Sequence, residues 1–367
     1  MNSLLVACSI GEALDKLTIL HINLDSIPDK RREDVLREYT DLRKTIGEEL
    51  LEKDSFHYQK LLEINRIMWK IQDELHGKQG EKEREFYLMK QLAVENQRRF
   101  RLKKVLNMNL GSLHKEQKGY AEKRCFILSH LGMGDLIFLN EAVRFLATLF
   151  DEVVLTCKKQ YETNVRDLFI DEPYVTLYIV NEDKDISPNF GCPPAKFQAF
   201  VKNFQACFLL GYHGKGNIDN FPHCFYDDIG ISHEIMKSWA HFPIATQIHD
   251  FTKSVLQKYS DITFCHTEAS NSSLNSMQIP INFDTSFVIN PSKNMYPVGH
   301  PFYEDAQQWV NKPLSWYYEI LPAAKQRFFI DSSFFCTALT MGLQATVWPR
   351  NGRTYKHVDS SLQEKYL

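Results

Sequence analysis

A loop that combines two glycines with an acid is the clearest chemical motif in the sequence. It reads Ser129-His130-Leu131-Gly132-Met133-Gly134-Asp135 and stands between an apolar run and an apolar helical stretch. Glycines let a backbone approach a ligand closely, and a helix N-terminus favours anions. Asp135 opens the helix, where a carboxylate can serve as a general base or simply stabilise the helix dipole. The residues alone leave both roles open.

A dinucleotide-binding loop is the obvious alternative for glycines that follow a strand. That motif requires a third glycine, which would fall at Ile137. It also requires an acid after the second strand, where this chain has Thr156-Cys157. Both features are missing, so we reject NAD binding.

A second motif, Asp331-Ser332-Ser333, joins an apolar run to a helical stretch. Serine hydroxyls and the unpaired amides of a helix N-terminus together make a cradle for phosphate. An ordinary helix cap is the alternative, because serine is among the favoured capping residues.

Three basic side chains follow other predicted strands of the C-terminal half. His266 ends one apolar run, and Lys293 and His300 lie in the loop after the next. Lys293 could neutralise a diphosphate leaving group or be a solvated loop lysine, and single histidines are more often structural than functional. No convincing Asp-x-Asp or CxxC pair is present, so no metal site is predicted.

Short apolar runs alternate with helical stretches from residue 124 onward. Strands are predicted at 125–129, 153–157, 175–180 and 206–211, with helices at 136–149, 161–169 and 195–203. After a connecting region at 212–258, strands are predicted at 262–266, 287–290, 327–331 and 345–349, with helices at 302–310, 314–324 and 333–341. This alternation is typical of parallel, doubly wound sheets, which bind ligands at the carboxyl ends of their strands. We therefore expect two Rossmann-like lobes.

The first 120 residues differ in composition, because they are dense in charge and contain a single proline, Pro28. Ser9 and Glu12 form a capping box, and apolar residues repeat at helical spacing within 35–50 and 61–75. These stripes predict a helical hairpin or short coiled coil whose apolar residues pack as a core. The basic run at 98–104 could contact an anionic membrane or nucleic acid, but a solvated helix face is the favoured interpretation.

Bulk composition limits the class of protein. The formal net charge is −3, which gives no overall attraction to nucleic acid. The eight cysteines are scattered, several of them within apolar runs, as in reducing compartments. The N-terminal apolar stretch lacks a basic region and soon meets charged residues, so it does not predict a signal peptide. These features predict a soluble, cytoplasmic protein.

The strand, Gly-x-Gly-Asp loop and apolar helix at 125–149 resemble the N-terminal lobe of the heptosyltransferase-like family, glycosyltransferase family 9. In that family the aspartate of the Gly-Asp pair is taken as the base that deprotonates the acceptor hydroxyl, and this role falls on Asp135. The run from Asp331 resembles the element that holds the donor diphosphate, although Phe334-Phe335-Cys336 replaces its histidine region. The first 110 or so residues resemble a family of small uncharacterised proteins, which implies no activity.

The resemblance implies a fold of the GT-B class, with a helical domain at 1–120, an acceptor-side lobe at 121–245 and a donor-side lobe at 246–367. It implies metal-independent, inverting transfer of a sugar from a nucleotide diphosphate sugar to a glycan or other hydroxyl acceptor, with no cofactor. A nucleotide-sugar epimerase or hydrolase is the enzymatic alternative, and a non-catalytic scaffold acting through the helical domain is the other. The helical domain is expected to mediate homo-oligomerisation or to dock a partner.

Overall fold

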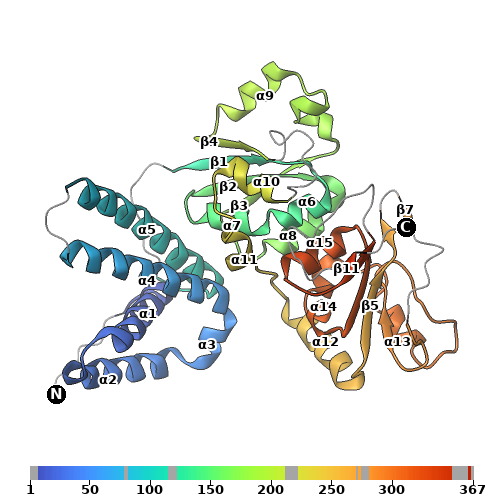
Figure 1. Ribbon diagram of the computed structural model, residues 1–367, viewed down its shortest axis with the longest axis horizontal. Helices are drawn as coiled ribbons and strands as arrows, with labels where there is room; N and C mark the ends of the chain where they lie inside the picture. Colours follow the sequence, from blue (N-terminus) through green and yellow to red (C-terminus); the bar gives the residue numbers. More distant parts are fainter. Residues whose placement is uncertain are drawn as a thin grey trace. The chain divides into compact units, whose positions relative to one another are not determined.

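The computed structural model describes residues 7–77, 82–114, 122–210, 222–269, 272–273, 281–348 and 363–364 (Figure 1). Two compact units make up the chain. The first combines Met1–Lys123 with two short segments, Leu146–Glu152 and Asp171–Tyr174, and the second contains the remaining residues. An all-helical region followed by two parallel sheets confirms the predicted fold class. No helix within the described ranges is long and apolar enough to cross a membrane.

Helices α1, α4 and α5 form the centre of the first unit. The Ser9 hydroxyl accepts a hydrogen bond of 3.1 Å from the Glu12 amide, which confirms the serine half of the predicted capping box, whereas the Glu12 carboxylate pairs with Lys103. The helices of the unit are α1 (Ile10–Ser26), α2 (Asp29–Ile46), α3 (Glu48–Lys53), α4 (Ser55–Gly77) and α5 (Lys82–Asn109).

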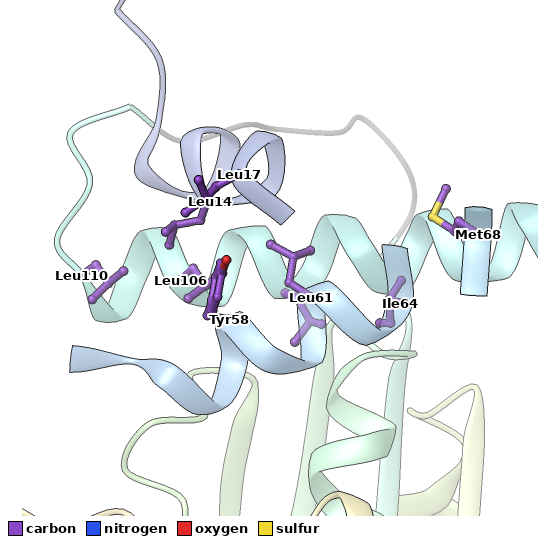
Figure 2. Packing of buried hydrophobic residues seen from close by; sticks show 9 residues of the cluster. Leu14, Leu17, Tyr58, Leu61, Ile64, Met68, Leu106 and Leu110 are labelled. Carbon is purple, nitrogen blue, oxygen red and sulfur yellow. The ribbon is translucent and has the colours of Figure 1, made fainter. Parts of the chain in front are cut away.

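The core of this bundle contains the apolar stripe predicted at 61–75. Figure 2 shows side chains of α1, α4 and α5 directed toward one another; they include Leu14, Leu17, Tyr58, Leu61, Ile64, Met68, Leu106 and Leu110. Tyr39 and Leu42 of α2 are half-buried against the same cluster. Core packing is therefore the role of both stripes, as expected.

The basic run of α5 does not form the predicted solvated face. Arg98, Arg101 and Lys103 are buried, and each is paired with an acid. The acidic partners come from α1, α5 and the segment Leu146–Glu152. The ion pairs of the run, with that of the neighbouring Arg99, are Arg98–Glu95, Arg99–Asp15, Arg101–Asp151 and Lys103–Glu12. Lys104 lies over the ring of Tyr174. The prediction of a solvated face was wrong because most of these partners are remote in sequence and cannot be identified from the run itself. Because the charges are paired within the protein, they do not support a membrane or nucleic-acid contact.

A buried histidine joins α4 to the segment Asp171–Tyr174. His57 Nδ1 lies 2.7 Å from Asp54 Oδ1, and His57 Nε2 lies 3.0 Å from Glu172 Oε1. Burial disfavours the imidazolium, yet the charge of Glu172 and the hydrogen bond with Asp54 raise the pKa of His57 to about 10. A charged histidine between two carboxylates therefore ties the helical bundle to this segment.

Both sheets of the second unit consist of parallel strands. The first has the order β3-β2-β1-β4 and the second β11-β10-β9-β5-β8, while β6 and β7 form a separate antiparallel hairpin. The strands are β1 (Arg124–Leu128), β2 (Glu152–Lys158), β3 (Val175–Val180), β4 (Ala206–Leu209), β5 (Ile262–His266), β6 (Glu268–Ala269), β7 (Ser272–Ser273), β8 (Phe287–Ile289), β9 (Gln326–Ile330), β10 (Thr346–Trp348) and β11 (Gln363–Glu364).

The helices of the second unit depart from prediction at three places. The helix expected at 136–149 is two helices that break at Leu139, and the region expected to connect the lobes contains helices within 223–258. The helix expected at 314–324 is a 3-10 helix at Leu314–Tyr317 followed by a short α-helix at Ile320–Ala323. The α-helices are α6 (Met133–Phe138), α7 (Asn140–Ala147), α8 (Glu162–Leu168), α9 (Pro194–Val201), α10 (His223–Ile229), α11 (Ile235–Ser238), α12 (Thr246–Lys258), α13 (Tyr303–Gln307), α14 (Ile320–Ala323) and α15 (Ser333–Thr340).

Candidate active site

Each predicted motif follows a strand at which the strand order of its sheet reverses. In the first sheet β1 stands between β2 and β4, and the glycine loop follows β1. In the second sheet β5 stands between β8 and β9, and the Asp-Ser-Ser motif follows β9. Open parallel sheets bind ligands at such switch points, beyond the carboxyl ends of the strands. Strand order thus provides a physical reason to regard both loops as a site.

The glycine loop fixes the carboxylate of Asp135 at the start of α6. Asp135 is half-buried, and its Oδ2 accepts a hydrogen bond of 3.1 Å from the Gly132 amide. A Cβ atom at Gly132 would collide with this same oxygen. Leu131, buried beside it, has a left-handed backbone with φ of 48°. Such strain in a non-glycine residue concentrates at functional sites.

Gly134 makes room for a helix of the other sheet. A Cβ atom at Gly134 would stand 2.8 Å from Cys336 Sγ of α15, so only glycine fits without a shift. Helices α6 and α15 accordingly pack side by side (Figure 1). His130 of the same loop is exposed, with its ring edge-on to Phe225 at 5.9 Å. Close packing of two helices therefore accounts for Gly134.

His266 and Ser332 form a buried pair across the switch point of the second sheet. Their Nδ1 and Oγ atoms lie 2.9 Å apart. Ser332 occupies the N-cap position of α15, but its hydroxyl is not bonded to the helix amides. The ring of Phe334 packs on His266 at 4.6 Å, and burial lowers the pKa of His266 to about 4. His266 is therefore a neutral imidazole at physiological pH.

Asp331 and Ser333 flank this pair. Asp331 is buried at the end of β9, and its amide donates to the Trp348 carbonyl at 3.3 Å. Ser333 is half-buried in the first turn of α15, where its carbonyl accepts a hydrogen bond from the Thr337 hydroxyl. Both residues thus lie at the helix N-terminus, as the strand–helix pattern predicts.

Lys293 and His300 belong to other clusters. Lys293 Nζ lies 3.4 Å from Glu268 Oε1, and both side chains are exposed. The ring of His300 stacks on Tyr296 at 4.5 Å, and its Nδ1 accepts a hydrogen bond from the Phe302 amide. His300 therefore has a structural role in its turn, and the charge of Lys293 is offset by an acid.

The sequence did not indicate a buried polar cluster beside α6. Arg144 is fully buried, and its guanidinium donates to Asn140 Oδ1 and to the Leu168 carbonyl, each at 2.7 Å. Glu141 is also buried, 2.9 Å from the Tyr226 hydroxyl. Polar residues inside an apolar helix were the signal that could have revealed this cluster. In the described ranges no group of three or more His, Cys, Asp or Glu side chains is arranged to hold a metal.

No protein-family model matches the sequence, and no curated protein matches it either. Among solved structures, the chain is similar to a family 9 glycosyl transferase from Veillonella parvula DSM 2008, with 10% identity and a TM-score of 0.41 over 69% of this chain and 88% of that one. It is also similar to the dodecameric iron-containing heptosyltransferase TibC, with 12% identity and a TM-score of 0.38 over 69% and 65%.

A third similar structure is the ADP-heptose LPS heptosyltransferase II of E. coli, with 11% identity and a TM-score of 0.38 over 67% of this chain and 90% of that one.

Proposed function

We propose that residues 124–367 form a glycosyltransferase that moves a sugar from a nucleotide diphosphate sugar to a hydroxyl acceptor. One observation carries the proposal: the packing of Gly134 on Cys336 brings together a loop that carries an acid and a helix N-terminus lined with serines. Both stand at switch points of parallel sheets, where ligands of such folds bind. An acid that can accept a proton and a helix N-terminus that can bind an anion are the two groups that the proposed transfer needs.

Asp135 is the proposed base of this reaction. As the leaving diphosphate departs, the anomeric carbon gains oxocarbenium character, and the attacking hydroxyl must lose its proton. A carboxylate beside that hydroxyl accepts the proton directly. The hydrogen bond from the Gly132 amide holds the Asp135 carboxylate in one orientation, which lowers the cost of positioning it. A base that acts on the acceptor suits a single displacement, so we infer inversion at the anomeric carbon.

The N-terminus of α15 is the proposed site of the donor diphosphate. Its partial positive charge and the hydroxyls of Ser332 and Ser333 stabilise an anion, and this stabilisation needs no metal. Neutral His266 holds the Ser332 hydroxyl away from the helix cap. Lys293 contributes to this site only if its ammonium group leaves Glu268 and binds the diphosphate. His300 is not part of the proposed site, because its ring stacks on Tyr296.

Binding of the donor is the first test. Thermal-shift measurements on the full chain against a panel of nucleoside diphosphates and nucleotide sugars should reveal a stabilising donor, because a ligand of the native state raises its stability by mass action. A panel without any hit would contradict the proposal.

Asp135→Asn is the second test, because the amide keeps the size of the side chain but cannot accept a proton. Turnover should fall by ~10²–10⁴, and donor affinity should stay unchanged. Asp185→Asn is a matched control, since the Asp185 carboxylate accepts amide hydrogen bonds from Asn181 and Glu182 at 3.0 and 2.9 Å in a similar capping turn. Equal turnover in the two folded variants would reduce Asp135 to a helix cap.

A further inference from the structure

A buried carboxyl group lies at the end of the short helix that carries Asp135. Glu141 of α7 and Tyr226 of α10 are both almost completely buried. The Tyr226 hydroxyl is 2.9 Å from Glu141 Oε2 and 3.1 Å from the carbonyl oxygen of Phe138, the last residue of α6. One phenol group therefore faces two oxygens, one on each side of the break between α6 and α7.

The number of protons in this cluster determines the charge of Glu141. The Tyr226 hydroxyl has one proton to donate, and the Phe138 carbonyl can only accept. An ionised Glu141 could also only accept, so the single Tyr226 proton would have to be shared between two acceptors in a weaker three-centre bond or leave one contact without a proton. A neutral Glu141 supplies the missing proton: its carboxyl donates to the Tyr226 oxygen, and Tyr226 donates to Phe138. Both short distances are then hydrogen bonds.

We propose that Glu141 is a neutral carboxylic acid that, through Tyr226, anchors the C-terminal end of α6 and so positions Asp135. Helix α6 has six residues, and the Asp135 capping bond already fixes its first turn. The Tyr226–Phe138 hydrogen bond fixes its other end. Glu141 is thus a positioning residue. Its effect on catalysis depends on the proposed function, whereas its protonation state does not.

The electrostatic surroundings agree with a neutral acid. Burial raises the pKa of Glu141 to about 8, although its own backbone amide, the hydrogen bond that Tyr226 could donate to an ionised carboxylate and the charge of Arg144 act in the opposite direction. Tyr226 from α10 and Arg144 from α7 are the titratable and charged groups that act on it. Arg144 shares its guanidinium with Asn140 and the Leu168 carbonyl. A carboxyl group whose pKa is raised by folding favours the native state at low pH and loses that contribution as pH rises through the folded pKa.

Glu141→Gln separates a neutral acid from a carboxylate, because the amide has nearly the same shape and keeps one donor and one acceptor without titrating. Melting temperatures of the full chain should be similar for wild type and variant at pH 5. The wild type should then lose stability relative to the variant as pH rises, by about 5 °C or more at pH 8. The proposal would be overturned if the melting temperatures of wild type and variant changed in parallel with pH, or if the wild type became more stable relative to the variant as pH rises.

Infrared spectroscopy of the wild type provides a measurement that does not depend on the variant folding. At pH 7 in heavy water the spectrum should retain the carbonyl band of a protonated carboxyl, since solvent-exposed acids are ionised there. A spectrum with carboxylate bands alone would overturn the neutral state of Glu141.

Enzyme assays then test the positioning role. If the wild type transfers sugar, its kcat should fall above about pH 8, with an unchanged KM for the donor, and Glu141→Gln should not show this fall. Coincident kcat profiles would overturn the positioning role while leaving the glycosyltransferase proposal intact. A wild type that transfers no sugar would contradict the proposed function, while the melting and infrared results would still decide the charge of Glu141.

Discussion

Replacing Gly134 by alanine tests the helix contact on which the proposed site depends. The added Cβ atom would stand 2.8 Å from Cys336 Sγ, which is closer than the van der Waals contact of carbon and sulfur. Overpacking of this kind costs ~1–3 kcal/mol, and the better helix propensity of alanine offsets up to ~1 kcal/mol. We expect a net loss of ~1–2 kcal/mol in the free energy of unfolding of the second unit.

The second half of a double-mutant cycle is Cys336→Ala, which removes the sulfur. The Cys336 atom nearest to the new Cβ would then be its own Cβ at 3.9 Å, an ordinary contact. The double variant should therefore be more stable than the sum of the two single effects predicts, by ~1 kcal/mol or more. Urea titration of each variant measures this coupling.

Gly77→Ala is the control, because a Cβ atom there meets nothing within 4 Å. It should leave stability unchanged or raise it slightly. If Gly134→Ala behaves like this control and shows no coupling to Cys336, α6 and α15 do not pack as described. The observation that supports the glycosyltransferase proposal would then be lost.

Three further outcomes are expected. Ser332→Ala combined with Ser333→Ala should weaken nucleotide binding and cost ~1 kcal/mol of stability, which a domain of this size survives; unchanged affinity in calorimetry would contradict the phosphate role. Ile64→Asp with Met68→Asp places two charges in the bundle core and should abolish much of its helix content, which circular dichroism would show; retained helicity would mean that this core is misplaced. Wild type should be more stable than His57→Gln near neutral pH, and the difference should shrink as pH approaches about 10, because the imidazolium is favoured below its raised pKa and lost above it. Melting curves at several pH values measure this difference, and a difference that is constant with pH would contradict the buried imidazolium.

Local sequence signals determined the secondary structure of the α/β region closely. The strands at 175–180 and 262–266 begin and end where predicted, because apolar runs bounded by polar residues specify short buried strands. The Ser9 cap and the stripe from Leu61 to Ile71 were equally readable, since a helix repeats its buried face every three or four residues. Five of the eight thiols are buried, and Cys125 is one of them, as its apolar run indicated.

Contacts between distant segments could not be obtained in this way. The basic run of α5 has the pattern of a solvated face, yet Arg99 and Lys103 pair with acids of α1 more than 80 positions away. Gly134 has the pattern of a ligand loop, but its neighbour is Cys336 in another sheet's helix. Only the fold brings such residues together.

The candidate site shows the same division. Sequence alone identified Asp135, His266 and Ser332 as chemically suitable residues at strand ends, because polar side chains there follow apolar runs. The strand order decided that both loops stand at switch points, and the fold placed His266 against a serine 66 residues away. The charge of a buried group such as Glu141 likewise depends on which oxygens surround it. Those neighbours come from separate helices, so no local pattern in the sequence could specify them.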